Sequence, residues 1–148
     1  MAQSTVTAAA VVSYSVDLEQ RSAELYRRLG ERFPDRAAAF QEAAAECLKV
    51  SSQVKRVYQE AVTDALETGF SFAGLELRAD LLPVADRLDI DMTHAMQLEA
   101  AAIAFYEAAS QCSSALLPSL ARAFRRIARA RRERAEALGM TLGDALRT

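Results

Sequence analysis

The chain has 148 residues, of which 51% are hydrophobic, and a formal net charge of -2 at pH 7. This length suits one domain with a core large enough to fold without metals or disulfides. Eighteen basic and twenty acidic residues nearly balance, which gives no electrostatic support to a nucleic-acid or membrane-surface role. No stretch reaches the roughly 18 consecutive apolar residues of a membrane span. Two cysteines do not make a disulfide framework and no export signal is evident, so we expect a cytoplasmic protein.

Alanine, leucine, glutamate and arginine dominate, with only five glycines and three prolines, and this composition predicts an all-α fold. Pro34 favours the first turn of a helix, so the short connection around it predicts an antiparallel pair. Gly69 is suited to the left-handed conformation that closes a helix. The expected helices span about residues 13–32, 35–67, 91–111 and 118–139, with a flexible N-terminus at 1–12 and a C-terminal tail at 140–148.

About two dozen residues separate the second and third expected helices. A connection of this length can carry the chain from one end of a bundle to the other. The expected architecture is therefore a single four-helix bundle, residues 13–139, in which two hairpins are joined by one long crossover. The crossover is more apolar than a solvated loop needs, so we expect it to cover the bundle or a second copy, and the protein to be a homodimer. Its large apolar residues are Phe70, Phe72, Leu75, Leu77, Leu81 and Leu82.

The two halves of the chain repeat a pattern. In the first helix Glu19 is followed six and seven residues later by a bulky pair, and in the third helix Glu99 is followed by a pair at the same spacing. The pairs are Leu25 with Tyr26 and Phe105 with Tyr106. The second and fourth helices also correspond, at offsets of 3, 4, 7 and 10 from Phe40 and from Phe124, which trace one side of a helix. The second half therefore looks like a copy of the first.

This pattern resembles the rubrerythrin-like branch of the ferritin-like superfamily. In that family the second helix of each half also supplies a glutamate and a histidine three residues apart, and with two further glutamates these residues hold a pair of iron atoms. The resemblance implies a ferritin-like bundle with peroxide or oxygen chemistry. Glu19 and Glu99 match the family's glutamates. The positions of the two Glu-x-x-His pairs are held here by Cys47 with Val50 and by Arg131 with Arg134.

These replacements remove four of the six ligands, because di-iron sites in such bundles need carboxylates and neutral imidazoles. Arginine stays protonated at any working pH and places a positive charge where a metal cation would lie. We therefore expect no bound iron or other cofactor. Arg131 lies in the apolar stripe of the fourth helix, and a buried cation requires a partner. We expect Arg131 to form salt bridges with Glu19 and Glu99, whereas Arg134 points inward or reaches solvent.

Other chemical groups have simpler interpretations. Tyr26 and Tyr106 are expected in the core, with hydroxyls that reach a polar neighbour. Cys47 is expected to be a buried apolar residue, or alternatively a thiolate whose pKa is lowered by Arg131. His94 lies near the start of the third helix, too far from the centre to be a ligand. The remaining arginines of the fourth helix should form a solvated face: Arg125, Arg126, Arg129 and Arg132.

Two functional interpretations remain. The favoured one is a ferritin-like protein that has lost its iron and acts as a structural or interaction subunit, with a second copy or an unknown protein as partner. The alternative is a rubrerythrin-type oxidoreductase with iron or an altered metal site. An alignment shifted by one residue would make Glu46 a retained acid, so that Glu19, Glu46 and Glu99 could hold one divalent ion. We prefer the unshifted alignment because Glu46 is turned partly away from the apolar stripe.

Overall fold

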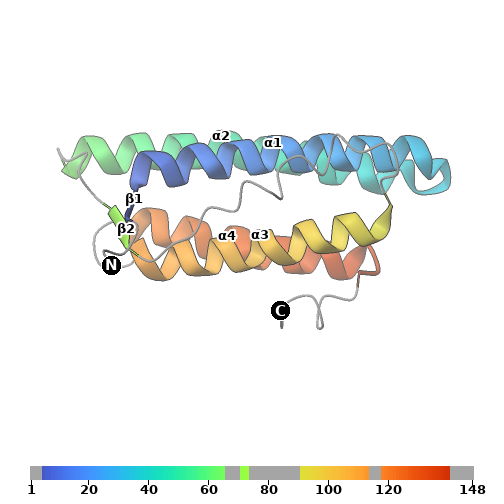
Figure 1. Ribbon diagram of the computed structural model, residues 1–148. Coiled ribbons are helices and arrows are strands. Elements are labelled where there is room, and N and C mark those ends of the chain that lie inside the picture. Colours follow the sequence, from blue (N-terminus) through green and yellow to red (C-terminus); the bar gives the residue numbers. More distant parts are fainter. Residues whose placement is uncertain (1–4, 66–70, 74–90, 114–117, 141–148) are drawn as a thin grey trace.

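The computed structural model describes residues 5–65, 71–73, 91–113 and 118–140, and these form a bundle of four α-helices (Figure 1). The helices are α1 (Ala8–Arg32), α2 (Ala37–Ala65), α3 (Met92–Ser113) and α4 (Pro118–Ala137). One hairpin is made by α1 and α2 and the other by α3 and α4, and the two hairpins pack together. The predicted all-α architecture of two helical hairpins is confirmed.

The start of α1 differs from the sequence expectation. The helix begins at Ala8 rather than near residue 13, because the Thr7 hydroxyl caps it by accepting the Ala10 N–H at 3.1 Å. Val11 and Val12 are buried in the core, which ties this first turn to the bundle. The expectation of a flexible segment was therefore wrong for residues 8–12.

A short strand pair precedes α1. Strand β1 (Thr5–Thr7) pairs antiparallel with β2 (Ser71–Ala73), with Val6 opposite Phe72. This pair was not expected, because three residues are too few to give a period-2 signal in a sequence. Backbone hydrogen bonding in β1 thus joins the beginning of the first hairpin to part of the expected crossover.

The other helix ends lie close to the expected ones. A turn of 3₁₀ helix (Pro34–Arg36) leads into α2, with Pro34 in its first turn as its ring geometry favours. Asp91 caps α3, because its carboxylate accepts the N–H groups of Thr93 and His94 at 3.0 and 3.3 Å. The start of α2 lies two residues after the expected one and that of α3 one residue after it, within the usual uncertainty of helix termini.

The end of α4 is closed by Gly139. Its φ of 79° is left-handed, the conformation that glycine adopts at least cost. The N–H of Gly139 bonds to the Glu136 carbonyl at 3.0 Å, and the N–H of Met140 bonds to the Ala135 carbonyl at 2.9 Å. This pair of bonds is the Schellman arrangement. The expected stop at Gly139 is confirmed.

The end of α2 and the start of α3 lie at opposite ends of the bundle in Figure 1, as expected for hairpins joined by one crossover. Only residues 71–73 of that connection are described. Gly69 lies outside the described residues, as do most of the apolar side chains expected to cover the bundle, namely Phe70, Leu75, Leu77, Leu81 and Leu82. None of the described helices is both long and apolar enough to cross a membrane.

Aromatic side chains fill the core on either side of its middle. Near the start of α1, the rings of Tyr14 and Phe105 lie 4.8 Å apart, and Phe124 packs against Tyr106 at 5.6 Å. Near the end of α1, Tyr26 stacks on Phe40 at 6.1 Å. Because α1 carries Glu19 between Tyr14 and Tyr26, the middle of the bundle is a polar layer between two aromatic ones.

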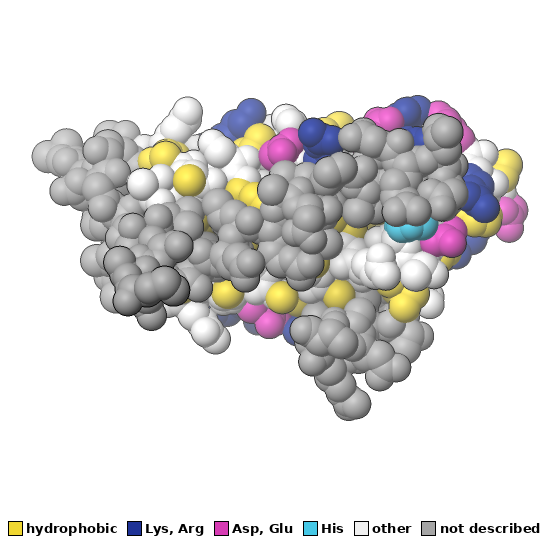
Figure 2. All heavy atoms as spheres, in the orientation of Figure 1, with side chains coloured by type: hydrophobic (Ala, Val, Ile, Leu, Met, Phe, Trp, Pro, Cys, Tyr) yellow, Lys and Arg dark blue, Asp and Glu magenta, His cyan; other side chains and the backbone are white. Residues whose placement is uncertain are grey.

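The surface carries mixed charges. Figure 2 shows acidic and basic side chains side by side at the end of the bundle where α1 and α2 are joined. There Arg27 bridges Glu24 and Glu31 along α1, with a nitrogen 2.5 Å from the Glu24 carboxylate. Such exposed pairs contribute little to stability, because water and salt screen them. The stability of the fold therefore depends on the buried side chains rather than on these surface pairs.

Two glycines should respond in opposite directions to replacement by alanine. We predict that Gly139→Ala lowers the free energy of unfolding by about 1 to 2 kcal/mol, since a Cβ disfavours the left-handed backbone. A Cβ at the helical Gly30 would meet Phe40 Cβ at an ordinary 3.5 Å. Gly30→Ala should therefore raise the free energy of unfolding by about 0.5 to 1 kcal/mol, because alanine is the better helix former. Urea denaturation measures both, and equal changes would contradict the assigned backbone conformations.

Candidate functional site

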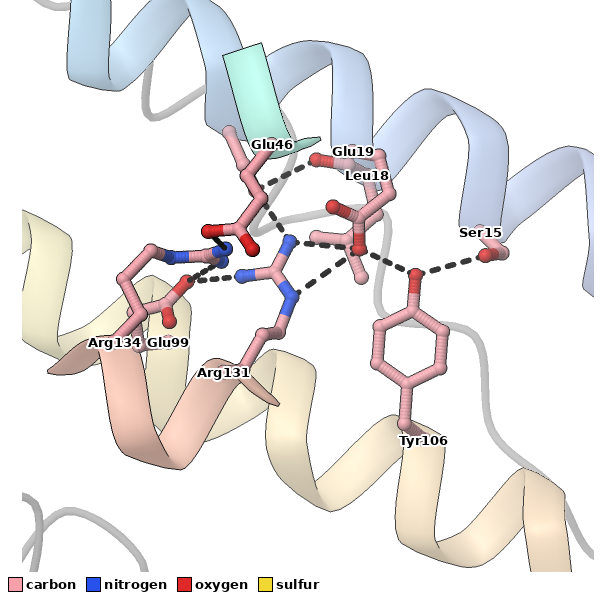
Figure 3. A network of polar contacts seen from close by, with 9 residues as sticks. Ser15, Leu18, Glu19, Glu46, Glu99, Tyr106, Arg131 and Arg134 are labelled. Atoms are coloured by element: carbon pink, nitrogen blue, oxygen red, sulfur yellow. Dashed lines mark hydrogen bonds and ion pairs between the residues drawn. The ribbon is translucent and has the colours of Figure 1, made fainter. Parts of the chain in front are cut away.

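Four helices contribute charged and hydroxyl side chains to the middle of the bundle, and we call this group the central ion cluster (Figure 3). Its members are Ser15, Glu19 and Ser22 of α1, Glu46 of α2, Glu99 and Tyr106 of α3, and Arg131 and Arg134 of α4. Glu19 and Glu99 are each only 1% exposed, as their expected salt bridges with a buried Arg131 require. Helical spacings of three and four residues place Ser15, Glu19 and Ser22 on the core face of α1.

Arg131 is the largest fully buried side chain among the described residues, with 1% exposure. Its Nη2 and Nε donate to Oε2 of Glu19 at 2.9 and 3.2 Å, and its Nη1 donates to Oε1 of Glu99. A further bond from Nη2 reaches the Ser22 hydroxyl at 2.9 Å. The predicted inward guanidinium, with salt bridges to both glutamates, is confirmed. Ser22 is a partner that sequence reasoning missed, although it lies on the inward stripe one turn from Glu19.

Arg134 also turns inward, which decides between the two orientations left open by the sequence. Its side chain is 9% exposed, and its Nη2 lies 3.5 Å from Oε1 of Glu99. On the outer side, its Nη1 lies 3.9 Å from Oε2 of Glu46, a residue whose side chain is 55% exposed. Arg134 therefore connects the buried carboxylate to the surface of α2.

Hydroxyl groups extend the cluster along α1. The Tyr106 hydroxyl donates to Oε2 of Glu19 at 2.5 Å and lies 2.8 Å from the Ser15 hydroxyl. The Ser22 hydroxyl donates to the Leu18 carbonyl at 2.7 Å, which leaves its lone pairs for Arg131. These bonds hold the Glu19 carboxylate in one orientation. Oε2 of Glu19 accordingly accepts hydrogen bonds from both Tyr106 and Arg131.

Tyr26 differs from Tyr106. Its ring is buried as expected, but its hydroxyl has no hydrogen-bond partner among the described residues. The expectation that both tyrosine hydroxyls reach a polar neighbour is therefore correct only for Tyr106. Three other buried polar atoms likewise find no partner in the described part of the chain: Oε1 of Glu19, Oε2 of Glu99 and Nε of Arg134.

In the buried part of the cluster two guanidinium groups face two carboxylates. Burial acts to lower the pKa of Arg131, but the two glutamate carboxylates outweigh this effect and hold the pKa well above its ordinary value. The pKa of Arg134 is raised for the same reason, with Glu99 as the main opposing charge. Burial raises the pKa of both Tyr26 and Tyr106. The guanidinium groups therefore stay charged and the phenols stay protonated at physiological pH.

Cys47 is fully buried, as expected for an apolar residue. Burial raises its pKa to about 12, and this effect is larger than the opposite one of Arg131 and Arg134. The thiol is therefore protonated at neutral pH, contrary to the alternative of a reactive thiolate. Val50 is half-buried and lines a groove between α2 and α4.

The side chains of this site do not fit a metal centre. The guanidinium of Arg131 contacts an oxygen of each buried glutamate, so a cation would have to displace it. Among residues 5–65, 71–73, 91–113 and 118–140, no group of three or more His, Cys, Asp or Glu side chains is placed to hold a metal ion. Glu46 is half-exposed, and His94 accepts the Asp91 N–H at 3.1 Å at the start of α3.

The remaining arginines of α4 lie at the surface. Arg125, Arg126 and Arg129 are exposed, and Arg132 pairs with Glu107 at 2.7 Å with 43% of its side chain accessible. The expectation of a solvated face is confirmed. The position of each arginine on the helical face of α4 therefore decides whether it lies at the surface or, like Arg131 and Arg134, in the core.

No protein-family model, curated protein or solved structure matches this chain. The comparisons therefore identify no family, and the likeness to rubrerythrin-like proteins rests on the residue pattern.

Arg131 and Arg132 are adjacent in the sequence, but the ion pairs of Arg131 are buried and that of Arg132 is exposed. We predict that Arg131→Ala lowers the free energy of unfolding by about 3 to 5 kcal/mol, because it leaves two carboxylates buried without a cation. Arg132→Ala should lower it by less than about 1 kcal/mol, because its pair with Glu107 is exposed. Chemical denaturation of the two variants gives the comparison. An Arg131→Ala variant as stable as the parent would show that the buried ion pairs are absent.

The two buried tyrosines allow a second comparison. Tyr106→Phe removes a hydrogen bond to a charged carboxylate, so we predict a loss of about 1.5 to 3 kcal/mol. Tyr26→Phe removes a hydroxyl that has no described partner and should change stability by less than about 0.5 kcal/mol or increase it. Thermal unfolding of both variants tests the assignment, which equal losses would contradict.

Proposed function

We propose that this chain is a ferritin-like protein whose bundle no longer binds a di-iron centre and that acts as a structural or interaction subunit rather than as an enzyme. The observation that supports this proposal is the position of the Arg131 guanidinium between the carboxylates of Glu19 and Glu99. A fixed cation neutralises the two acids that a metal would need. Its charge cannot be removed by any change in pH within the working range.

The cost of displacing Arg131 supports the same proposal. A divalent ion bound to Glu19 and Glu99 would leave the guanidinium in the core without a counter-ion, and such a buried charge costs several kcal/mol. Arg134 adds a second cation against Glu99, which opposes metal binding further. The resemblance to di-iron proteins therefore extends to the bundle and not to its chemistry.

The buried groups also offer little for catalysis. Cys47 and the two buried tyrosines are protonated at neutral pH, so none supplies a nucleophile or base. With its buried carboxylates neutralised by guanidinium groups, the bundle would act through its surface. The role of interaction subunit follows from that argument, with a second copy or another protein as partner.

Metal content tests the proposal. We predict that protein produced in medium supplemented with iron and manganese retains only substoichiometric metal after dialysis, as measured by elemental analysis. Millimolar Mn²⁺ should leave its melting temperature unchanged, because a ligand stabilises only a state that it binds. The Arg131→Ala variant, in which Glu19 loses its guanidinium partner and Glu99 keeps only the 3.5 Å contact with Arg134, provides a control in which Mn²⁺ should raise the melting temperature. Near-stoichiometric iron or manganese in the parent would instead favour the oxidoreductase alternative.

A further inference from the structure

A groove runs along the outside of the bundle between α2 and α4. It consists of two hollows of about 510 and 330 Å³ that meet at Glu46 and Ala130. Its floor is apolar and includes Val50, Val54 and Ile127. We call it the α2–α4 groove and define its two halves by their charges. The acidic half has Glu42, Glu46 and Glu133, with Arg134 as its one cation, and the basic half has Lys49, Arg56 and Arg126.

Most of the charged side chains along the α2–α4 groove form no ion pair within the described part of the chain. Lys49, Arg56 and Arg126 form no ion pair with any other described residue, and the same holds for Glu42 and Glu133. Glu46 is the exception, through its 3.9 Å contact with Arg134. One further acid, Glu60, lies beyond Arg56 at the far end of the basic half. Each half therefore carries a net charge, most of which has no partner among the described residues.

The two halves lie in a fixed order. Because α2 and α4 run in opposite directions, Glu42 lies beside Glu133, and Arg56 and Arg126 line the other hollow together. Opposite charges thus lie on either side of a midpoint near Glu46 and Lys49. A surface of this kind is complementary to itself after a rotation by 180°, the operation that relates the subunits of a two-fold dimer.

We propose that a second copy of this chain packs on the α2–α4 groove in an antiparallel, two-fold arrangement. The acidic half of each copy then lies against the basic half of the other, and both contacts are attractive. The exposed small side chains of Ala39, Ala130 and Ala137 along the groove let the helices of the two copies approach closely. The second copy would also cover the apolar floor of the groove.

The size of the face is consistent with a dimer. From residue 39 to residue 60, α2 advances about 32 Å at about 1.5 Å per residue. Two adjacent helices make a face about 20 Å wide. Its footprint is on the order of 600 Å² before side-chain roughness is counted, close to the roughly 800 Å² that each partner buries in a standard interface. This inference names the surface for the interaction role proposed above and so rests on it.

Charge reversal gives a sharp test by light scattering and analytical ultracentrifugation at micromolar concentration. The parent should be a dimer that weakens between 0.1 and 1 M NaCl, as the screening length falls from about 10 to about 3 Å. The acidic-half variant Glu42→Lys/Glu133→Lys and the basic-half variant Arg56→Glu/Arg126→Glu should each be monomeric. An equimolar mixture of the two variants should form heterodimers, because both contacts become attractive again.

Adjacent residues supply a matched control. Lys55→Glu/Arg125→Glu makes the same change in charge at exposed positions that do not line the groove, so it should remain dimeric. Far-UV circular dichroism confirms that each variant is folded. A monomeric parent, variants that remain dimeric, or a control that also dissociates would each overturn the assignment of this face. None of these outcomes affects the metal content of the parent, so the proposed function is tested separately.

Discussion

The fold depends on one electrostatic constraint, the neutralisation of a guanidinium that is 1% exposed. A cation in that position is tolerated only when carboxylates contact it directly, and Glu19 and Glu99 provide that contact from two different helices. Since Arg131 belongs to α4, the three side chains join both hairpins at one point. The ion pairs therefore specify how α1, α3 and α4 are aligned, in a core whose other residues are mostly apolar and less directional.

The surroundings of Arg131 follow from the same constraint. Hydroxyl groups on the inward faces complete the hydrogen bonds of Glu19, whereas rings on both sides exclude water and strengthen the electrostatic attraction. Not every polar atom is satisfied, since one oxygen of each buried glutamate lacks a described partner. The buried groups of this centre supply no free metal ligand, nucleophile or base. This is why the function proposed here lies at the surface, where the α2–α4 groove presents separated charges above an apolar floor.

Much of the fold was predictable from the sequence. Several signals can be read from the sequence alone because they are local. They are the helix-forming composition, the prolines and glycines at helix ends, and the repeated patterns around Glu19 and Glu99. The burial of Arg131 was also predictable, because its position seven residues from Phe124 and from Leu138 places it in an apolar stripe. The strand pair and the early start of α1 were missed, because both depend on backbone contacts between distant segments or on a single capping hydroxyl.

The sequence by itself determined that Glu19, Glu99 and Arg131 lie on the core faces of their helices, because helical periodicity is a property of the chain alone. Tertiary structure decided how those charges pair. Arg134 turns inward because Glu99 and Glu46 lie on either side of it, which no spacing along α4 specifies. Tyr106 is hydrogen-bonded, whereas the Tyr26 hydroxyl has no partner among the described residues, although the two occupy equivalent places in the repeat. Hydrogen bonds require distances of about 3 Å, and only the packing of separate helices sets distances that precisely.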